Sequence, residues 1–285
     1  MRILRPLVYS NLFVAIVLSL LTSASYVRLN LDWEWPVIVS VFLGSYVLYS
    51  FHRLYKIDFI PVDQRGERHS WILNRANIIK ITMSLSVFVA MLLLPNFDVD
   101  EIIWLVPAGI ASLGYTIPFI PTEKRWLRLR DVPLTKPLII ALVVTYITLC
   151  FPIFVNENIE AIFLPKNLTL FFGRFLFLLA VTIPFEIRDS INDYKAGLKT
   201  LATELGLKNA KRIAISSLTG WLIIWAIQYI ESRDHWLLTA GIIVFILASI
   251  AIVKIDKALS ELQYVMIFEG LIVLYSLGII FTGLI

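Results

Sequence analysis

The chain has 285 residues, of which 59% are hydrophobic and only 16% are charged, whereas soluble domains have about 25% charged and 45–50% apolar residues. This composition excludes an ordinary soluble domain and favours a polytopic membrane protein. The formal net charge of +4 is small, and it does not indicate nucleic-acid binding, because the cations concentrate in alternate connections between apolar segments. The single cysteine, Cys150, allows no intramolecular disulfide.

Nine apolar segments are long enough to cross a membrane, which requires roughly 17–25 residues for about 30 Å of hydrocarbon. The sequence therefore predicts an all-α fold, a bundle of nine transmembrane helices with cytoplasmic cap loops, forming one integral-membrane domain over residues 1–285. The first segment resembles a signal peptide, but the apolar character of every later segment favours a retained helix. The predicted spans cover residues 7–27, 35–54, 78–95, 102–120, 137–155, 168–185, 213–230, 236–253 and 262–284.

The distribution of cations predicts the orientation of these spans. Of the 25 Lys and Arg residues, only four lie on one side of the predicted bundle, which leaves 21 on the other. The four are Arg28, Lys166, Arg174 and Arg233. Cytoplasmic loops carry an excess of Lys and Arg, so we expect a cytoplasmic N-terminus, an outer C-terminus and a location in the plasma (inner) membrane. The long, mixed-charge connections are then cytoplasmic, and chemistry is expected there.

The connection after the sixth span carries an unusual set of carboxylates. Glu186, Asp189 and Asp193 are spaced i, i+3 and i+7, so in a helix they project from one face. Such a face can hold Mg²⁺, which prefers carboxylate oxygens and usually takes one or two of them together with phosphate oxygens and water. The alternative from spacing alone is a solvated loop between two spans.

Residues after this acidic face could complete a phosphate site. Arg188 and Lys199 supply positive charge that could neutralise a diphosphate, and Gly197 permits a turn at the end of the acidic helix. Thr200 or Thr203 could begin a short amphipathic helix that runs through Leu205 and ends near Lys211, and that lies over a cavity mouth or rests on lipid head groups.

Two other cytoplasmic connections are rich in charge. Residues 115–136 contain a basic cluster, which could attract anionic lipid or clamp phosphate oxygens. Residues 49–71 combine acids with arginines, and we expect surface ion pairs between them. The basic cluster comprises Lys124, Arg125, Arg128 and Arg130, and the acids and arginines of the other connection are Asp58, Asp63, Glu67, Arg53, Arg65 and Arg68.

Two charges fall inside predicted spans. Arg174 lies near the outer end of the sixth span, where its side chain could extend to the interface, and Glu269 lies in the inner part of the last span. Ionisable groups at such depth usually face a cavity or a neighbouring span. Glu269 is therefore expected to do one or the other.

The string FEIRDSINDYKAGLKTLATELG resembles the second aspartate-rich motif of the UbiA superfamily of intramembrane prenyltransferases, which has the form D-x-R-D-x-x-x-D-x-x-x-G-x-x-T-L followed by L-G. Glu186 stands where the family usually has Asp. The number of spans and the long loops after the second, fourth and sixth spans agree with the family. The matching residues are Arg188, Asp189, Asp193, Gly197, Thr200, Leu201, Leu205 and Gly206, with Tyr115, Pro118, Lys124 and Arg125 in a second family-like segment.

The first family motif, N-D-x-x-D-x-x-x-D at the end of the second span, is degenerate here. The aligned stretch is SFHRLYKID, with Ser50 in place of Asn and Leu54 in place of Asp. Of the three motif positions compared, Ser50, Leu54 and Asp58, only Asp58 keeps the family residue.

The resemblance implies Mg²⁺-dependent transfer of an isoprenyl group from a prenyl diphosphate to an aromatic or other electron-rich lipophilic acceptor within the membrane. It places metal on Asp189 and Asp193, with Glu186 and Asp58 as further candidates, and it makes Tyr115, Asp189 and Asp193 the catalytic residues. The diphosphate-binding residues would be Arg53, Lys124, Arg125, Arg188 and Lys199. The alternatives are a non-catalytic UbiA-like protein that binds a lipid or quinone-like molecule, and a secondary transporter.

Overall fold

The computed structural model describes residues 4–57, 66–121, 126–132, 134–195, 197–255 and 259–282. Helices dominate these ranges, and a two-residue antiparallel strand pair, Ile120–Pro121 (β1) with Trp126–Leu127 (β2), lies in one connection. The α-helices are α1 (Leu4–Tyr9), α2 (Leu12–Leu29), α3 (Trp35–Ile57), α4 (Glu67–Leu73), α5 (Ala76–Leu93), α6 (Val99–Thr116), α7 (Lys136–Thr145), α8 (Phe151–Asn156), α9 (Ile159–Ile162), α10 (Pro165–Lys195), α11 (Leu201–Glu204), α12 (Gly206–Ser232), α13 (His235–Lys254) and α14 (Glu261–Thr282). Short 3₁₀ turns, η2 (Leu94–Asn96) and η3 (Leu129–Asp131), and a π-helical turn, η4 (Tyr146–Cys150), complete the elements.

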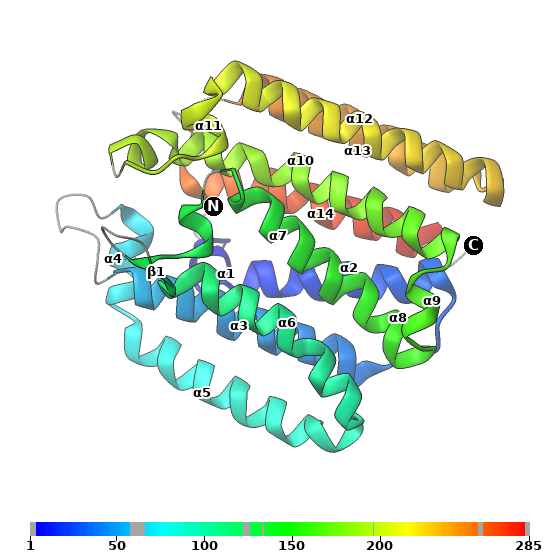
Figure 1. Cartoon of the computed structure of the whole chain (residues 1–285), viewed down its shortest axis with the longest axis horizontal. Helices are drawn as coiled ribbons and strands as arrows, with labels where there is room; N and C mark the ends of the chain where they lie inside the picture. Colours follow the sequence, from blue (N-terminus) through cyan, green and yellow to red (C-terminus); the bar gives the residue numbers. More distant parts are fainter. Residues whose placement is uncertain are drawn as a thin grey trace.

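The long helices run side by side as one bundle (Figure 1). Short elements from the three long connections, α4, β1 and α11, gather at one end, near the N-terminus, whereas α8, α9 and the C-terminus lie at the other end. We call the first of these the loop end. The predicted grouping of the long connections at a single end of an all-helical bundle is therefore confirmed.

Eight helical segments in the described ranges are long and apolar enough to cross a membrane, and each corresponds to a predicted span. Helix α6 lies where the predicted span 102–120 was expected, but Asp100 and Glu101 in its first turn and Pro107 in its interior make it less apolar. The count of nine spans therefore stays a prediction.

Helix α10 occupies the middle of the packing, in contact with α7, α12 and α14. An aromatic cluster fixes these contacts: the ring of Phe177 stacks on Tyr275 at 4.6 Å between centroids and lies 5.1 Å from the ring of Trp221. Because lipid tails are as apolar as the side chains, such close packing, and not water exclusion, holds transmembrane helices together. By contrast, Ile79 is the single buried residue of α5, and many of its other apolar side chains, such as Ile81 and Phe88, are exposed.

Helix α10 also runs well past the predicted span 168–185, and this extension carries the acidic face. The helix ends at Lys195, and Gly197 then adopts φ +67, a left-handed conformation that glycine tolerates without a Cβ penalty. The Thr200 side chain caps α11 by accepting a hydrogen bond from the Thr203 backbone N–H. The acidic helix, the glycine turn and a helix start at Thr200 are present, but the short helix ends at Glu204, and Lys211, where its end was expected, lies within α12.

The prediction that Arg174 extends to the interface is wrong. Its side chain is only 3% exposed, and Nη1 donates to Ser25 Oγ at 2.6 Å and to the Thr148 carbonyl oxygen at 2.7 Å. Thr148 belongs to the π-helical turn η4, where the regular helical hydrogen bonding changes, and its carbonyl accepts from outside the helix. Neutral oxygens of neighbouring helices thus hold this arginine inside the bundle.

Candidate functional site

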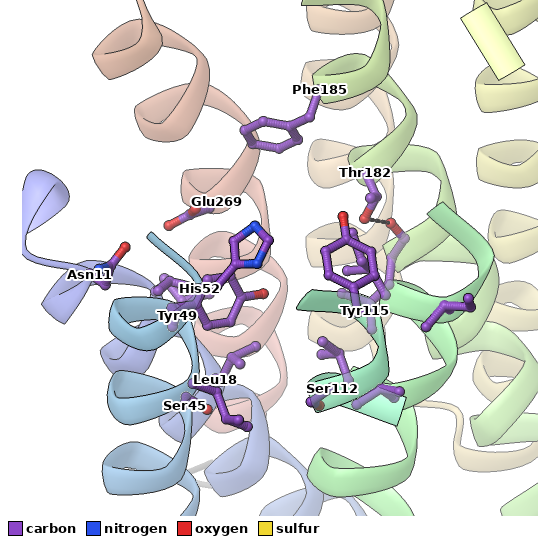
Figure 2. A pocket seen from close by; sticks show the side chains of 18 of the residues that line it. Asn11, Leu18, Ser45, Tyr49, His52, Ser112, Tyr115, Thr182, Phe185 and Glu269 are labelled. Atoms are coloured by element: carbon purple, nitrogen blue, oxygen red, sulfur yellow. Dashed lines mark hydrogen bonds between the residues drawn. The ribbon is translucent and has the colours of Figure 1, made fainter. Parts of the chain in front are cut away.

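A cavity of about 280 Å³ lies between α2, α3, α6, α7, α10 and α14. Charged lining groups come from the loop end of these helices: Arg53, Arg68, Arg130, Lys136, Arg188 and Asp189, with Glu269 further along α14. Aliphatic side chains line the part inside the bundle, including Val14, Val17, Leu18, Val143, Val144, Leu178 and Val181. In Figure 2, Tyr49, His52 and Glu269 approach this space from one side, and Tyr115 and Thr182 from the other. The cavity is therefore charged at the loop end and apolar inside the bundle, which suits an amphiphilic ligand.

Lys136, the first residue of α7, connects the cavity to the acidic face of α10. Its Nζ lies 3.6 Å from Asp189 Oδ2 and 3.5 Å from Asp193 Oδ2. Lys136 is 7% exposed and Asp193 is 6% exposed, so this ion triad is largely buried. The two carboxylates reach one ammonium because residues four apart lie on the same side of a helix, as predicted.

Arg188 is fixed on the same turn of α10. Its Nε donates to Asp189 Oδ1 at 2.8 Å, and its guanidinium carbon lies 5.3 Å from the ring centroid of Phe185 and 5.5 Å from that of Tyr264. Aromatic faces and a carboxylate together restrain the side chain at the cavity wall. Arg188 therefore presents a pre-organised guanidinium, as its predicted role in phosphate binding requires.

Glu186 takes a different role from its neighbours. The residue is 1% exposed, and Oε2 accepts a hydrogen bond from the Leu201 backbone N–H at 3.0 Å. This contact ties the first turn of α11 to α10, so Glu186 fixes the short helix in place. Glu186 is not among the residues that line the cavity.

A second charged cluster joins α1–α2, α3, α4 and α14. Glu261 Oε1 lies 3.0 Å from Arg53 Nη2 and 2.8 Å from Arg68 Nη1. Arg68 also donates to Asn11 Oδ1 at 2.7 Å, and the Asn11 amide donates to Ser50 Oγ at 3.2 Å. Burial, together with repulsion from Arg53, lowers the pKa of Arg68 to about 10, so its guanidinium stays charged at neutral pH. The arginines thus pair with an acid of the last helix, and Arg68 is buried where surface ion pairs were expected.

Arg130 and His52 form a third polar group, at the loop end of α3 and α6. Arg130 Nη1 lies 3.4 Å from His52 Nε2, and His52 Nδ1 lies 3.0 Å from Thr116 Oγ1. Because arginine can only donate, Nε2 is the acceptor and Nδ1 carries the proton. The Arg130 guanidinium carbon lies 5.5 Å from the Tyr115 ring centroid. Tyr115 lines the cavity, as predicted, and the Arg130 guanidinium lies over its ring.

The remaining predicted site residues are not brought to this cavity by the described structure. The Lys199 side chain is 66% exposed and lies 4.0 Å from Glu204, outside the cavity lining. Asp58, Lys124 and Arg125 lie outside the described residues. The roles predicted for these three residues stay predictions.

The described carboxylates do not fit a divalent-cation site. Within the ranges that the structure describes, no three His, Cys, Asp or Glu side chains come together in a way that could hold a metal ion. Asp189 and Asp193 share the ammonium of Lys136, and Glu186 is bound to a backbone amide. The expected Mg²⁺ ligands of α10 are therefore engaged with protein groups.

Several cavity residues were not predicted to belong to the site. Lys136 stands at the start of an apolar span, where a cation has a ready explanation in membrane topology. Arg68 and Glu261 lie far apart in sequence, and no local spacing relates them. Glu269 was expected to face either a cavity or a neighbouring span, and it lines the cavity.

The fold and this cavity define an all-helical integral-membrane protein, and solved structures with the same architecture are UbiA-type proteins. A UbiA homologue from Archaeoglobus fulgidus bound to GPP and Mg²⁺ superposes with a TM-score of 0.66 at 14% sequence identity, over 97% of this chain and 99% of the homologue. Another structure of a UbiA homologue from the same organism gives 0.62 at 13% identity, covering 98% of each chain. A digeranylgeranylglyceryl phosphate synthase gives 0.60 at 16% identity, covering 96% of this chain and 97% of the synthase.

The chain thus has the UbiA fold, as the resemblance of its second acidic motif predicted. No protein-family model and no curated protein matches the sequence. At 13–16% identity the structural likeness establishes the fold, and the activity has to be argued from the cavity itself.

Proposed function

We propose that this protein is an intramembrane prenyltransferase, which transfers the prenyl group of a prenyl diphosphate to an aromatic or other electron-rich lipophilic acceptor. One observation carries the proposal: a single cavity is lined by cations at the loop end of the bundle and by aliphatic side chains inside it. A diphosphate head and a prenyl tail have the same two-part polarity. The GPP-bound UbiA homologue of the same fold supports this class of substrate.

The cavity residues suit the bond changes of such a transfer. The bond between C1 of the prenyl group and the diphosphate oxygen breaks, and its electron pair leaves with the diphosphate. Arg188 and Lys136 stabilise the charge that develops on the leaving oxygen. The allylic carbon, which becomes positive, lies against the aromatic rings of Tyr115 and Phe185, whose faces attract cations, and the surrounding apolar wall excludes water.

The acceptor then forms a bond to C1 and loses a proton. Glu269 is the proton acceptor in this proposal, because it lines the cavity beyond the cationic cluster and its Oε2 has no hydrogen-bond partner among the described residues. Asp189 and Asp193 act by holding Arg188 and Lys136 at the head-group position. The proposal therefore retains both aspartates of the second motif at the site, as positioning residues.

The orientation that we propose places the loop end of the bundle in the cytoplasm, in a plasma (inner) membrane. The cation asymmetry of the sequence supports it. The water-soluble diphosphate product would then leave the cavity at its cationic loop end, directly into the cytoplasm.

Purified protein tests this proposal directly. Geranyl, farnesyl and geranylgeranyl diphosphates are each supplied with a panel of phenols and quinols, and both diphosphate release and prenylated product are measured. The expected result is stoichiometric release and product formation, strongly reduced in Arg188→Met. Folding of this variant is checked by its Tm. Absence of product with every donor and acceptor, in protein that binds the donor, would refute the transferase.

A non-catalytic lipid-binding or quinone-binding protein is the second candidate. Its support is the first motif, in which Ser50 and Leu54 replace two family ligands. Ser50 is fully buried and hydrogen-bonded by Asn11. This candidate predicts saturable binding of prenyl diphosphates or quinones in the assay, without turnover.

A further inference from the structure

We infer that the head group of the substrate is bound directly by protein cations and without a divalent metal ion, with the Lys136 ammonium in the place between two acidic side chains that a metal would take. The inference rests on the proposed function, because it takes a diphosphate as the head group. It departs from the Mg²⁺ dependence that the resemblance implies.

The first observation is the state of Lys136. Its Nζ is nearly equidistant from Asp189 Oδ2 and Asp193 Oδ2, at 3.6 and 3.5 Å. These distances suit an ion triad but exceed ordinary charged hydrogen bonds of about 2.7–2.9 Å. Lys136 lines the cavity, and its Nζ is buried and has no hydrogen-bond partner in the described part of the chain. An ammonium has three donors, so this one can donate to diphosphate oxygens while its charge is balanced from behind.

The second observation is the face that α3 presents to the cavity. Ser45, Leu48, Tyr49, His52 and Arg53 line the cavity, with the three- and four-residue spacing of one helix face. Ser50 is fully buried on another side of the helix and accepts a hydrogen bond from Asn11. The face that α3 presents to the cavity therefore carries a cation, Arg53, while the first-motif position Ser50 is buried away from the cavity.

Arg68 adds a second guanidinium on the same side of the cavity. Its Nη1 contact with Glu261 and its Nη2 contacts with Asn11 and Val8 hold the group rigidly at the wall. Arg130 comes from the η3 turn, is 6% exposed and has an unpartnered Nε among the described groups. Guanidinium groups match phosphate oxygens in pairs of parallel hydrogen bonds, which an ammonium cannot do.

The third observation is the sign of the charge in the lining. The described lining contains five cations, Arg53, Arg68, Arg130, Lys136 and Arg188, and two carboxylates, Asp189 and Glu269. With Glu261 and Asp193, which pair with three of these cations from outside the lining, five cations face four acids, a formal excess of one positive charge. Such a surface attracts an anionic head group.

A binding experiment tests the inference without requiring turnover. The probe is geranyl S-thiolodiphosphate, which resists ionisation, titrated into the purified full chain in detergent, once with EDTA and once with MgCl₂. We expect the same Kd in both, competition by inorganic diphosphate and no competition by geraniol. Phosphatidylglycerol is titrated as a separate arm to distinguish a lipid head group from a free diphosphate.

A pair of lysine variants makes the test specific. Lys136→Met should weaken binding of the probe in EDTA by about tenfold or more, as expected for the loss of a charge-assisted hydrogen bond. Lys208→Met removes an exposed lysine outside the cavity lining and should leave Kd unchanged. The comparison of EDTA with MgCl₂ in the unmodified chain decides the question even if Lys136→Met does not fold.

The outcomes separate the inference from the proposed function. Binding of the probe only in MgCl₂ overturns the inference, while product formation under the same conditions leaves the transferase intact. Equal binding with EDTA and with MgCl₂, but no product from any donor, upholds the inference and removes the transferase. Unchanged affinity in folded Lys136→Met would show that Lys136 is not a head-group ligand.

Discussion

Replacement of Lys136 by methionine should convert a metal-indifferent protein into one that Mg²⁺ stabilises. Methionine keeps most of the aliphatic stem but removes the charge that Asp189 and Asp193 share. At 3.5 Å and an effective dielectric constant of about 20, one such pair has a Coulomb energy of about 5 kcal/mol. Truncation of one partner of a buried ion pair costs about 3–5 kcal/mol. The Asp189 side chain is 30% exposed, so solvent screens its interaction with Lys136. The lower figure, about 3 kcal/mol, is therefore expected for the loss of stability.

Thermal unfolding in detergent measures the effect. A loss of about 3 kcal/mol should lower the Tm by roughly 5–10 °C for a chain of this size. The variant leaves Asp193 without the Lys136 ammonium and Asp189 paired with Arg188, so Mg²⁺ should bind between these two carboxylates one helical turn apart. At a concentration a hundredfold above its Kd, a ligand that binds only the folded state adds about 2.7 kcal/mol. Mg²⁺ should therefore restore most of the lost Tm.

The controls decide whether Lys136 itself is responsible. Lys199→Met carries the same chemical change at an exposed site, and its Tm should match that of the unmodified chain with or without Mg²⁺. If Mg²⁺ raises the Tm of the unmodified chain as much as that of Lys136→Met, the ammonium does not occupy a metal position, and the reasoning fails.

Three further substitutions test other parts of the structure. Glu269→Gln should reduce prenyl transfer about a hundredfold while leaving the Kd of the thiolodiphosphate unchanged, since a general base contributes about 10²–10⁴-fold; an equal loss of binding would assign it to the head group instead. Glu186→Ala should cost about 1–3 kcal/mol and accelerate amide exchange at Leu201, which loses its buried acceptor; exchange as slow as in the native chain would contradict this. Gly241→Ala should destabilise by about 1–3 kcal/mol, measured as a lower Tm, because its Cβ would overlap the buried indole of Trp225; an unchanged Tm would mean that the indole moves freely.

Hydropathy was enough to predict most of the bundle. A transmembrane helix is specified by a long local run of apolar residues, so eight segments could be located without tertiary information. Helix α6 shows where this signal weakens, because Asp100, Glu101 and Pro107 interrupt it. The end of α10 was also underestimated, because a helix can continue beyond the apolar segment wherever packing supports it.

The site was only half predictable, for a physical reason. The shared face of Asp189 and Asp193 is a property of one helix and follows from their spacing. The partner of that face, Lys136, comes from another helix, and helix packing decides which cation arrives there. Arg174 illustrates the same limit, because its buried position depends on the neutral oxygens of Ser25 and Thr148, which belong to other helices.

Leu54 changes the meaning of the degenerate first motif. It packs against the apolar cluster of Ile57, Ile72 and Ile79, which joins α3 to α4 and α5. An aspartate at this position would put a carboxylate into that cluster, where an unpaired charge is costly. Leu54 therefore fits its apolar surroundings, so this departure from the family pattern also changes the packing of α3 and not only the set of metal ligands. On the neighbouring face of α3, Arg53 is directed to the cavity and anchored by Glu261. Leu54 thus serves the packing of α3 against α4 and α5, while Arg53 on the neighbouring face gives the cavity a cation.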